Sequence, residues 1–281
     1  MRNYSYDISH IKNALSDVGL RQGDTAYFST GLGFIGPADD IQNQGELNQL
    51  YLRAMRQIIG NEGTILIPAY SYSIGKSTRQ TPIVFDPLTT PAEAGPFPDY
   101  FLKQKGVIRS HDPMVSMAGL GPSAGILFKD LPPTSYGADS LYARLVDFHN
   151  TKCINLGLGP NWIPFLHHAD WLAKVPFRYD KNFYGGIKRV EGIEYVNWHY
   201  SVAVQKEECR ADAHELGQMA LDQGIWAYAT LGRGGVYGCE YNKLFDFVLD
   251  SIKKDPWLTA KGPACDVDEK IREEKAKSML V

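Results

Sequence analysis

Two neighbouring stretches determine the fold: Cys153-Ile154-Asn155-Leu156-Gly157-Leu158-Gly159 and, closely after it, Asn161-Trp162-Ile163-Pro164-Phe165-Leu166-His167-His168-Ala169-Asp170. The first is a short apolar run that ends in glycines, which predicts a buried strand. Pro164 suits the first position of a helix, where its missing N–H is not needed. A buried strand that leads directly into a helix is the repeating unit of an α/β fold.

The predicted helix places His167 and Asp170 on one face, because residues three apart are neighbours on a helix surface. His168 points roughly a quarter-turn away. Open α/β sheets bind ligands at the carboxyl ends of their strands, and a carboxylate there can orient a histidine as a base near neutral pH. An ordinary surface hydrogen bond and a zinc site both remain open, since His-His-x-Asp offers zinc ligands. No second group of ligands is evident, so no metal is expected.

The chain on either side of this segment continues the α/β pattern. Amphipathic spacing predicts helices over Ile8–Val18 and Glu46–Ile59, and apolar runs predict strands over Thr25–Ser29 and Thr64–Pro68. Alternating polarity over Tyr195–Gln205 predicts an antiparallel strand. We therefore expect an α/β fold with a central, mostly parallel mixed sheet flanked by helices.

A proline-rich segment from Tyr70 to Pro98 interrupts this alternation. Long irregular segments inside compact domains are usually functional, so this one is either a substrate-binding lid or an insertion without a binding role. Tyr72 and Asp86 are its candidate substrate-binding residues.

The composition excludes several classes of protein. A net charge of −3 over 281 residues gives no reason to expect nucleic acid or an anionic membrane as a partner. The four cysteines have no C-x-x-C spacing, and neither a signal peptide nor a membrane-spanning stretch is evident, so we expect reduced thiols and a cytoplasmic location. We expect one domain over residues 1–281, with a charged tail at 265–281 that is either docked or free, and a homodimer remains one option for the assembly.

Several motifs, taken in order, resemble the aminoglycoside 3-N-acetyltransferase family, and more closely its sugar-modifying relatives in surface-polysaccharide pathways. The likeness covers roughly Asp24 to Arg178. The matching blocks are Ser29-Thr30-Gly31-Leu32 with Gly36, Gly63-Thr64-Ile65-Leu66-Ile67-Pro68-Ala69, Phe85-Asp86-Pro87, Gly106-Val107-Ile108-Arg109-Ser110-His111-Asp112-Pro113-Met114-Val115-Ser116, Leu156-Gly157 and Pro164-Phe165-Leu166-His167-His168-Ala169-Asp170.

The resemblance implies an antibiotic N-acetyltransferase fold and an enzyme that transfers an acetyl group from acetyl-CoA to an amine on a sugar. It implies that His167 is the catalytic base, partnered by Asp170. No cysteine lies in a matching motif, so direct transfer is expected. The candidate acetyl-CoA-binding residues are Ser29, Thr30, Gly31, Arg109, Ser110 and Ser140. The further candidates for substrate binding are His111 and Asp112. Arg109 contacts a CoA phosphate or braces its loop, and both alternatives stay open.

Three residues depart from the family pattern: Ser29 and Asp112 each replace a histidine, and Pro164 replaces a threonine. We therefore expect an acceptor other than a typical aminoglycoside, namely a nucleotide-linked amino sugar or related saccharide, with Asp112 holding an ammonium group. The alternatives are an aminoglycoside 3-N-acetyltransferase that confers antibiotic resistance, a metal-assisted hydrolase that uses His167, His168 and Asp170, and a sugar-binding protein without catalysis.

Overall fold

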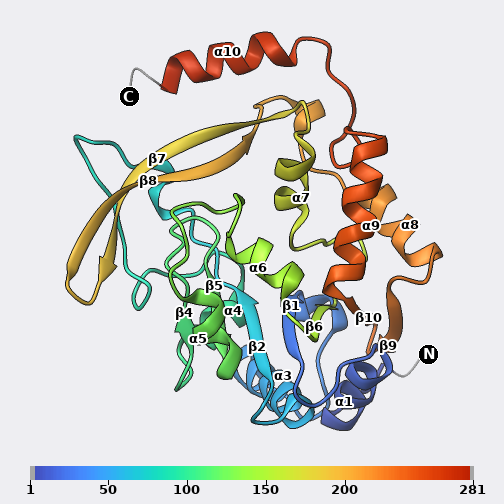
Figure 1. The fold of residues 1–281 in the computed structure, drawn as a ribbon. Helices are drawn as coiled ribbons and strands as arrows, with labels where there is room; N and C mark the ends of the chain where they lie inside the picture. Colours follow the sequence, from blue (N-terminus) through green and yellow to red (C-terminus); the bar gives the residue numbers. More distant parts are fainter. Residues whose placement is uncertain (1–3, 279–281) are drawn as a thin grey trace.

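The computed structural model describes residues 4–278, and a seven-stranded sheet lies at the centre of this part of the chain (Figure 1). The strand order is β4-β5-β2-β1-β6-β10-β9. The strands are β1 (Thr25–Thr30), β2 (Thr64–Pro68), β4 (Ile108–Arg109), β5 (Met117–Leu120), β6 (Thr151–Leu156), β9 (Ala227–Leu231) and β10 (Gly234–Glu240).

Parallel pairing is confined to the middle of this sheet. Strand β1 pairs in parallel with both β2 and β6, whereas the other neighbouring pairs are antiparallel. The predicted α/β fold with a mixed, helix-flanked sheet is confirmed, but the parallel part is smaller than expected. The reason is that the chain returns from β2 to its neighbour β5 in the opposite direction, after a long excursion.

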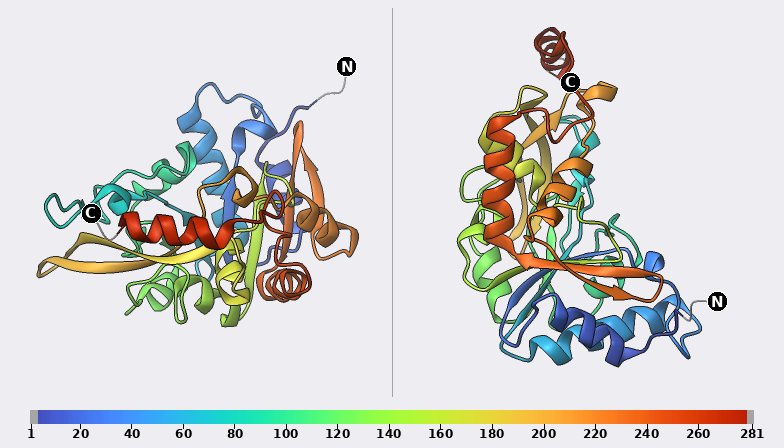
Figure 2. Two further views of the ribbon diagram at one scale, coloured as in Figure 1. Left: turned by 90° about the horizontal axis from the view of Figure 1, so that it is seen from above. Right: turned by 90° about the vertical axis from the view of Figure 1, so that its right-hand side faces the viewer.

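Helices cover both faces of the sheet, and each face has its own apolar core (Figures 1 and 2). Successive side chains along a strand point to opposite faces of the sheet. Tyr27 and Cys153 therefore belong to one core, and Phe28 and Ile154 belong to the other. One core includes helices α1 (Ile8–Asp17), α3 (Gln44–Ile59) and α4 (Pro96–Leu102). The other includes α5 (Pro122–Phe128), α6 (Leu141–Asp147), α7 (Leu166–Ala173), α8 (His214–Asp222) and α9 (Tyr241–Lys254). Short helical turns lie at α2 (Leu32–Ile35), η1 (Ser73–Lys76) and η2 (Glu207–Cys209).

A second sheet forms an arm beside this body (Figure 1). Strands β7 (Arg178–Arg189) and β8 (Gly192–Ala203) form a long antiparallel hairpin, and β3 (Val84–Phe85) pairs with β7. The antiparallel strand predicted near Tyr195 is therefore confirmed. Of the charged tail, helix α10 (Val267–Ser278) is docked, because the Glu274 carboxylate accepts hydrogen bonds of 2.9 Å from the Tyr179 hydroxyl and the Gln205 backbone.

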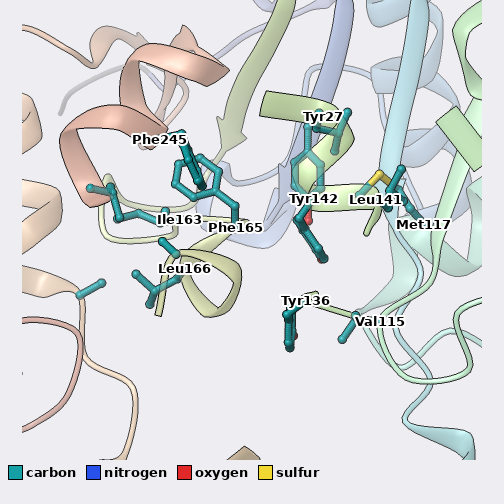
Figure 3. Packing of buried hydrophobic residues seen from close by; sticks show 14 of the residues in the cluster. Tyr27, Val115, Met117, Tyr136, Leu141, Tyr142, Ile163, Phe165, Leu166 and Phe245 are labelled. Atoms are coloured by element: carbon teal, nitrogen blue, oxygen red, sulfur yellow. The ribbon is translucent and has the colours of Figure 1, made fainter. Parts of the chain in front are cut away.

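The turn after β6 brings helix α7 over the carboxyl ends of β1 and β6. Gly157 has a φ of +74°, and a Cβ there would lie 2.4 Å from the Gly31 carbonyl oxygen, so only glycine fits. Asn155 fixes the following loop, because its side-chain amide donates to the carbonyls of Gly159 and Trp162 at 2.9 Å each. Figure 3 shows Phe165, at the start of α7, beside Phe245 of α9, and their ring centroids are 5.2 Å apart. Among residues 4–278, no helix combines the length and apolar composition needed to cross a bilayer.

Candidate active site

A cleft of about 630 Å³ lies at the carboxyl ends of β1 and β6, large enough for a drug-sized ligand. Strand β1 contributes residues to its lining, the segment after β2 contributes two tyrosines, and α7 contributes His167. The lining residues important here are Ser29, Thr30, Tyr70, Tyr72, Tyr136 and His167. This is the edge at which the sequence predicted a ligand site.

His167 and Asp170 form the predicted pair within α7. The Nδ1 atom of His167 lies 3.3 Å from Oδ2 of Asp170, while 32% of the His167 side chain remains accessible at the cleft. Asp170 is buried behind it, at 1% exposure. The hydroxyl of Thr259 donates to the other carboxylate oxygen of Asp170 at 2.6 Å. Both oxygens of Asp170 are thus held, which fixes the carboxylate against the imidazole.

Arg178, at the start of β7, adds a buried positive charge to this pair. Its Nη1 atom lies 3.1 Å from Nδ1 of His167 and 3.7 Å from Oδ2 of Asp170, and its Nη2 donates to the Ser201 carbonyl. A guanidinium can only donate and an ionised carboxylate can only accept. When Nδ1–H of His167 donates to Asp170, its Nε2 carries the free lone pair and can act as a base.

The surroundings keep His167 neutral. Burial, and next the charge of Arg178, hold its pKa below the ordinary value of 6.5, although the hydrogen bond and charge of Asp170 act in the opposite direction. The imidazole is therefore unprotonated at neutral pH, as a general base requires.

Three tyrosines form a wall of the cleft. The hydroxyl of Tyr70 is hydrogen-bonded to those of Tyr27, at 2.9 Å, and Tyr142, at 2.8 Å, and burial raises the pKa of Tyr70 to about 12. Tyr72 has a φ of +45°, an unusual conformation for a non-glycine residue and one that concentrates at functional sites. Tyr136 lies edge-on to His167, with ring centroids 5.7 Å apart. The wall thus offers neutral hydroxyls and aromatic rings to a ligand.

Comparisons with known proteins assign the family. The model of the aminoglycoside 3-N-acetyltransferase family matches residues 39–253. The chain belongs to this family. It is 30% identical over 282 residues to aminoglycoside N(3)-acetyltransferase IX of Micromonospora chalcea, covering 90% of this chain and 93% of that protein.

Solved structures show the same fold. The aminoglycoside acetyltransferase AAC-IIIb in a binary complex with CoASH has a TM-score of 0.74 at 20% identity, covering 93% of this chain and 100% of that one. AAC-VIa bound to sisomicin has a TM-score of 0.76 at 22% identity, covering 89% and 98%. Family membership makes this protein an acyltransferase, and the predicted resemblance to the N-acetyltransferase family is confirmed. A closer link to polysaccharide pathways has no support from these relatives.

Several predicted residues of the acetyltransferase come together in the cleft. Ser29, Thr30, Tyr72 and His167 line it, with Asp170 directly behind His167. The hydroxyls of Ser29 and Thr30 are buried without a protein partner. Gly31 follows them, and a Cβ there would lie 2.6 Å from the Leu158 side chain, so its role is close packing.

The block from Arg109 to Ser116 supports the cleft wall from behind rather than lining the cleft. Arg109 is buried, and its guanidinium donates to Ser116 and to the carbonyls of Ala69 and Thr90. This geometry matches the bracing alternative and not a contact with a CoA phosphate. Ser110 is likewise buried and accepts a hydrogen bond from the Met117 backbone at 2.9 Å.

Asp112 is also a structural residue, which corrects its predicted place in the acceptor pocket. Its Oδ1 accepts from the backbone N–H groups of Met114 and Val115 at 2.8 and 2.9 Å. Asp112 closes a turn in which the carbonyls of Met114 and Pro113 accept hydrogen bonds from the backbone N–H groups of residues 71–73. Asp112 therefore positions the segment that carries Tyr72. The alternative of an Asp112–Arg109 ion pair is not formed either.

The remaining predicted residues lie outside the cleft. Ser140 is the N-cap of α6 and accepts from the Ala143 backbone. Asp86 pairs with Lys188 at 2.8 Å. His111 lines a separate hollow with Arg189. None of the three lines this cleft, and their predicted contacts with acetyl-CoA and substrate stay predictions.

The metal-site alternative does not fit the arrangement of its proposed ligands. His168 is buried, with Nδ1 2.7 Å from the Tyr136 carbonyl oxygen, and its ring stacks on Trp171 and Phe245. His168 is thus committed to packing on another side of α7 from the His167–Asp170 pair. Within the described part of the chain, no group of three or more metal-ligating side chains converges.

Sequence reasoning missed Arg178, Thr259 and Asn155 as supports of the active site. In the sequence, Arg178 marked only the end of the stretch that resembles the family, and Thr259 lies 89 residues from its partner Asp170. The polar Asn155 within an otherwise apolar buried strand was a signal, because a buried amide needs hydrogen-bond partners.

The Asp112 geometry yields a signed pH prediction. Burial raises the pKa of Asp112 to about 6 from 3.8, so ionisation costs folding free energy. The folded state binds the proton more tightly than the unfolded one, and this stabilising contribution is lost as the pH rises through about 6. Asp112→Asn keeps the accepting oxygen without the charge. Its stability relative to wild type should therefore increase from pH 4 to pH 7, as measured by urea unfolding.

In the same variant, the KM values for acceptor and acetyl-CoA should both stay near wild type. A raised KM for the acceptor alone would restore Asp112 to the acceptor pocket.

Removal of the Arg178 charge should move the acid limb of kcat/KM to higher pH. Since Arg178 helps to hold the pKa of His167 down, Arg178→Met lets that pKa rise, and the base is protonated sooner as the pH falls. The measurement is the pH profile of acetyl transfer. Arg178→Lys keeps the charge and should leave the limb near its wild-type position. An unmoved limb in the methionine variant would show that Arg178 does not tune His167.

Proposed function

We propose that this protein transfers the acetyl group of acetyl-CoA to an amino group of an aminoglycoside. The observation that carries the proposal is the neutral His167 at the cleft, backed by Asp170, in a chain that belongs to the aminoglycoside 3-N-acetyltransferase family. The relatives reported above are named for aminoglycosides, so they favour this acceptor over the nucleotide-linked amino sugar expected from the sequence.

His167 activates the acceptor in this proposal. Near neutral pH most of the acceptor's amino groups are protonated. A protonated nitrogen carries no lone pair, so it cannot attack a thioester. The fraction of the amine that has lost this proton to solvent attacks, and Nε2 of His167 accepts a further proton from the nitrogen as it bonds to the acetyl carbonyl carbon. The carbon–sulfur bond then breaks, and the CoA thiolate leaves and takes up the proton from the imidazolium. Asp170 stabilises the imidazolium that forms. A base positioned in this way typically accelerates a reaction by ~10²–10⁴-fold.

The cleft also has groups suited to the acyl donor. The thioester carbonyl gains negative charge during attack, and preorganised donors stabilise such a charge. The buried hydroxyls of Ser29 and Thr30 lack protein partners and line the cleft, so they are available to hydrogen-bond acetyl-CoA. Three of the four cysteines are buried, and no cysteine is among the residues that line the cleft in the described chain, which supports direct transfer.

A screen of acceptors tests the proposal. Purified protein and acetyl-CoA are mixed with sisomicin, with gentamicin, or with a nucleotide-linked amino sugar, and thiol release and product mass are recorded. We expect release of CoA and a product one acetyl group heavier with the aminoglycosides. Turnover of the nucleotide-linked sugar alone would reject the aminoglycoside and restore the first expectation. The cytoplasmic location, single domain and homodimer remain predictions.

A further inference from the structure

One acidic side chain lines the cleft and takes no part in the reaction outlined above. Glu93 lies in the segment between β3 and α4, and it is the only Asp or Glu among the cleft-lining residues of the described chain. His167 reaches the same cleft from a different part of the chain, helix α7. No lysine or arginine is among these lining residues either. The charged side chains that line the cleft therefore leave it negative.

The backbone of Glu93 is fixed against the tyrosine wall. Its N–H donates to the Tyr70 carbonyl at 2.7 Å. Arg109 joins the same two segments from behind, because it donates to the carbonyls of both Ala69 and Thr90. These hydrogen bonds thus set the position of Glu93 beside Tyr70, although the residue lies in a segment with little regular structure.

The carboxylate of Glu93 is available to a ligand. It makes no hydrogen bond or ion pair with any of residues 4–278, and the residue is exposed. It is near enough to Tyr72 to act on that phenol electrostatically. Tyr70 and Tyr72 stand beside it, with ring centroids 6.1 Å apart, and aromatic faces attract cations. A carboxylate beside aromatic rings in a cleft without cations suits an ammonium group.

We infer that Glu93 binds a protonated amino group of the acceptor, and so selects acceptors that carry a second amine besides the one acetylated. This inference rests on the proposed function. The reacting amine must lose its proton to His167, whereas another amine of the same molecule stays charged and can pair with Glu93. A charge-assisted contact of this kind orients the acceptor before reaction. Glu93 is therefore a specificity-determining residue rather than a member of the proton-transfer pair.

Glu93→Gln tests the inference, because it removes the charge and keeps the shape. The KM for sisomicin should rise roughly tenfold, as expected for the loss of one charge-assisted hydrogen bond in a partly open cleft. The KM for acetyl-CoA should stay the same and kcat should change little. The rise should shrink at high salt, because ions screen partly exposed charges. Glu93→Asp keeps the charge and should recover part of the affinity.

The matched control is Glu62→Gln, which removes one exposed charge from the turn before β2, outside the cleft, and should leave every constant unchanged. Calorimetric binding of sisomicin without acetyl-CoA gives a second readout, in which Glu93→Gln should weaken binding by a similar factor. Unchanged affinity for sisomicin in a Glu93→Gln variant that is as active as wild type would overturn the inference and leave the proposed function standing. If wild-type protein acetylates no aminoglycoside, the proposed function fails, and the inference fails with it.

Discussion

His167→Ala should lower kcat by about 10³–10⁴-fold while the protein stays folded. The imidazole is the group at the cleft that can remove the proton from the acceptor amine, and burial and Arg178 keep it neutral for this task. Because 32% of the side chain is accessible and its hydrogen-bond partner Asp170 is also held by Thr259, loss of the ring should cost little stability. Steady-state kinetics and a thermal melt of the purified variant measure the two effects.

His168→Ala is the comparison that makes this test specific. His168 is buried, is hydrogen-bonded to the Tyr136 carbonyl and stacks on Trp171 and Phe245, so its loss should lower the melting temperature more than the loss of His167. Its effect on kcat should be far smaller, since it does not face the proton-transfer pair. The two adjacent substitutions thus have opposite profiles. Equal losses of kcat would show that the assignment of the base to His167 is wrong.

The features predicted correctly from the sequence are those with local signals. The spacing of three between His167 and Asp170 is visible in the sequence, and so are the apolar runs that became β1, β2 and β6. Asp112 was misassigned although a local signal was present, because an Asp before a proline commonly closes a turn with its own side chain. Its carboxylate does this at Met114 and Val115 instead of facing a ligand.

The features that sequence reasoning missed depend on contacts between distant segments. Arg109 is a brace because the carbonyls of Ala69 and Thr90 meet at its guanidinium, and nothing near Arg109 in the sequence indicates this. Glu93 lines the cleft for the same reason. A lone charged residue in a proline-rich segment has no periodicity that predicts its surroundings, and only the folded chain brings it to Tyr70.

Asp170→Asn should lower kcat by about 10²–10³-fold, less than the loss of His167 itself. Asparagine can present its NH₂ group to His167, and Nδ1 then accepts a hydrogen bond instead of donating one. The proton moves to Nε2, the position from which the base must act. The substitution also leaves the buried Arg178 without a carboxylate, so the free energy of unfolding should fall by about 3 kcal/mol. Urea unfolding and acetyl-transfer kinetics at one pH measure both effects.

Thr259→Val separates these two contributions, because it removes one hydrogen bond to Asp170 and leaves the carboxylate in place. It should lower stability by about 1 kcal/mol and kcat by less than Asp170→Asn.

The decisive measurement is the double variant. If Asp170 acts only through the imidazole, then Asp170→Asn should have almost no further effect on kcat in a His167→Ala background, because the base that it orients is already absent. Losses that multiply instead would give Asp170 a role independent of His167, and the coupled pair inferred from their hydrogen bond would have to be abandoned.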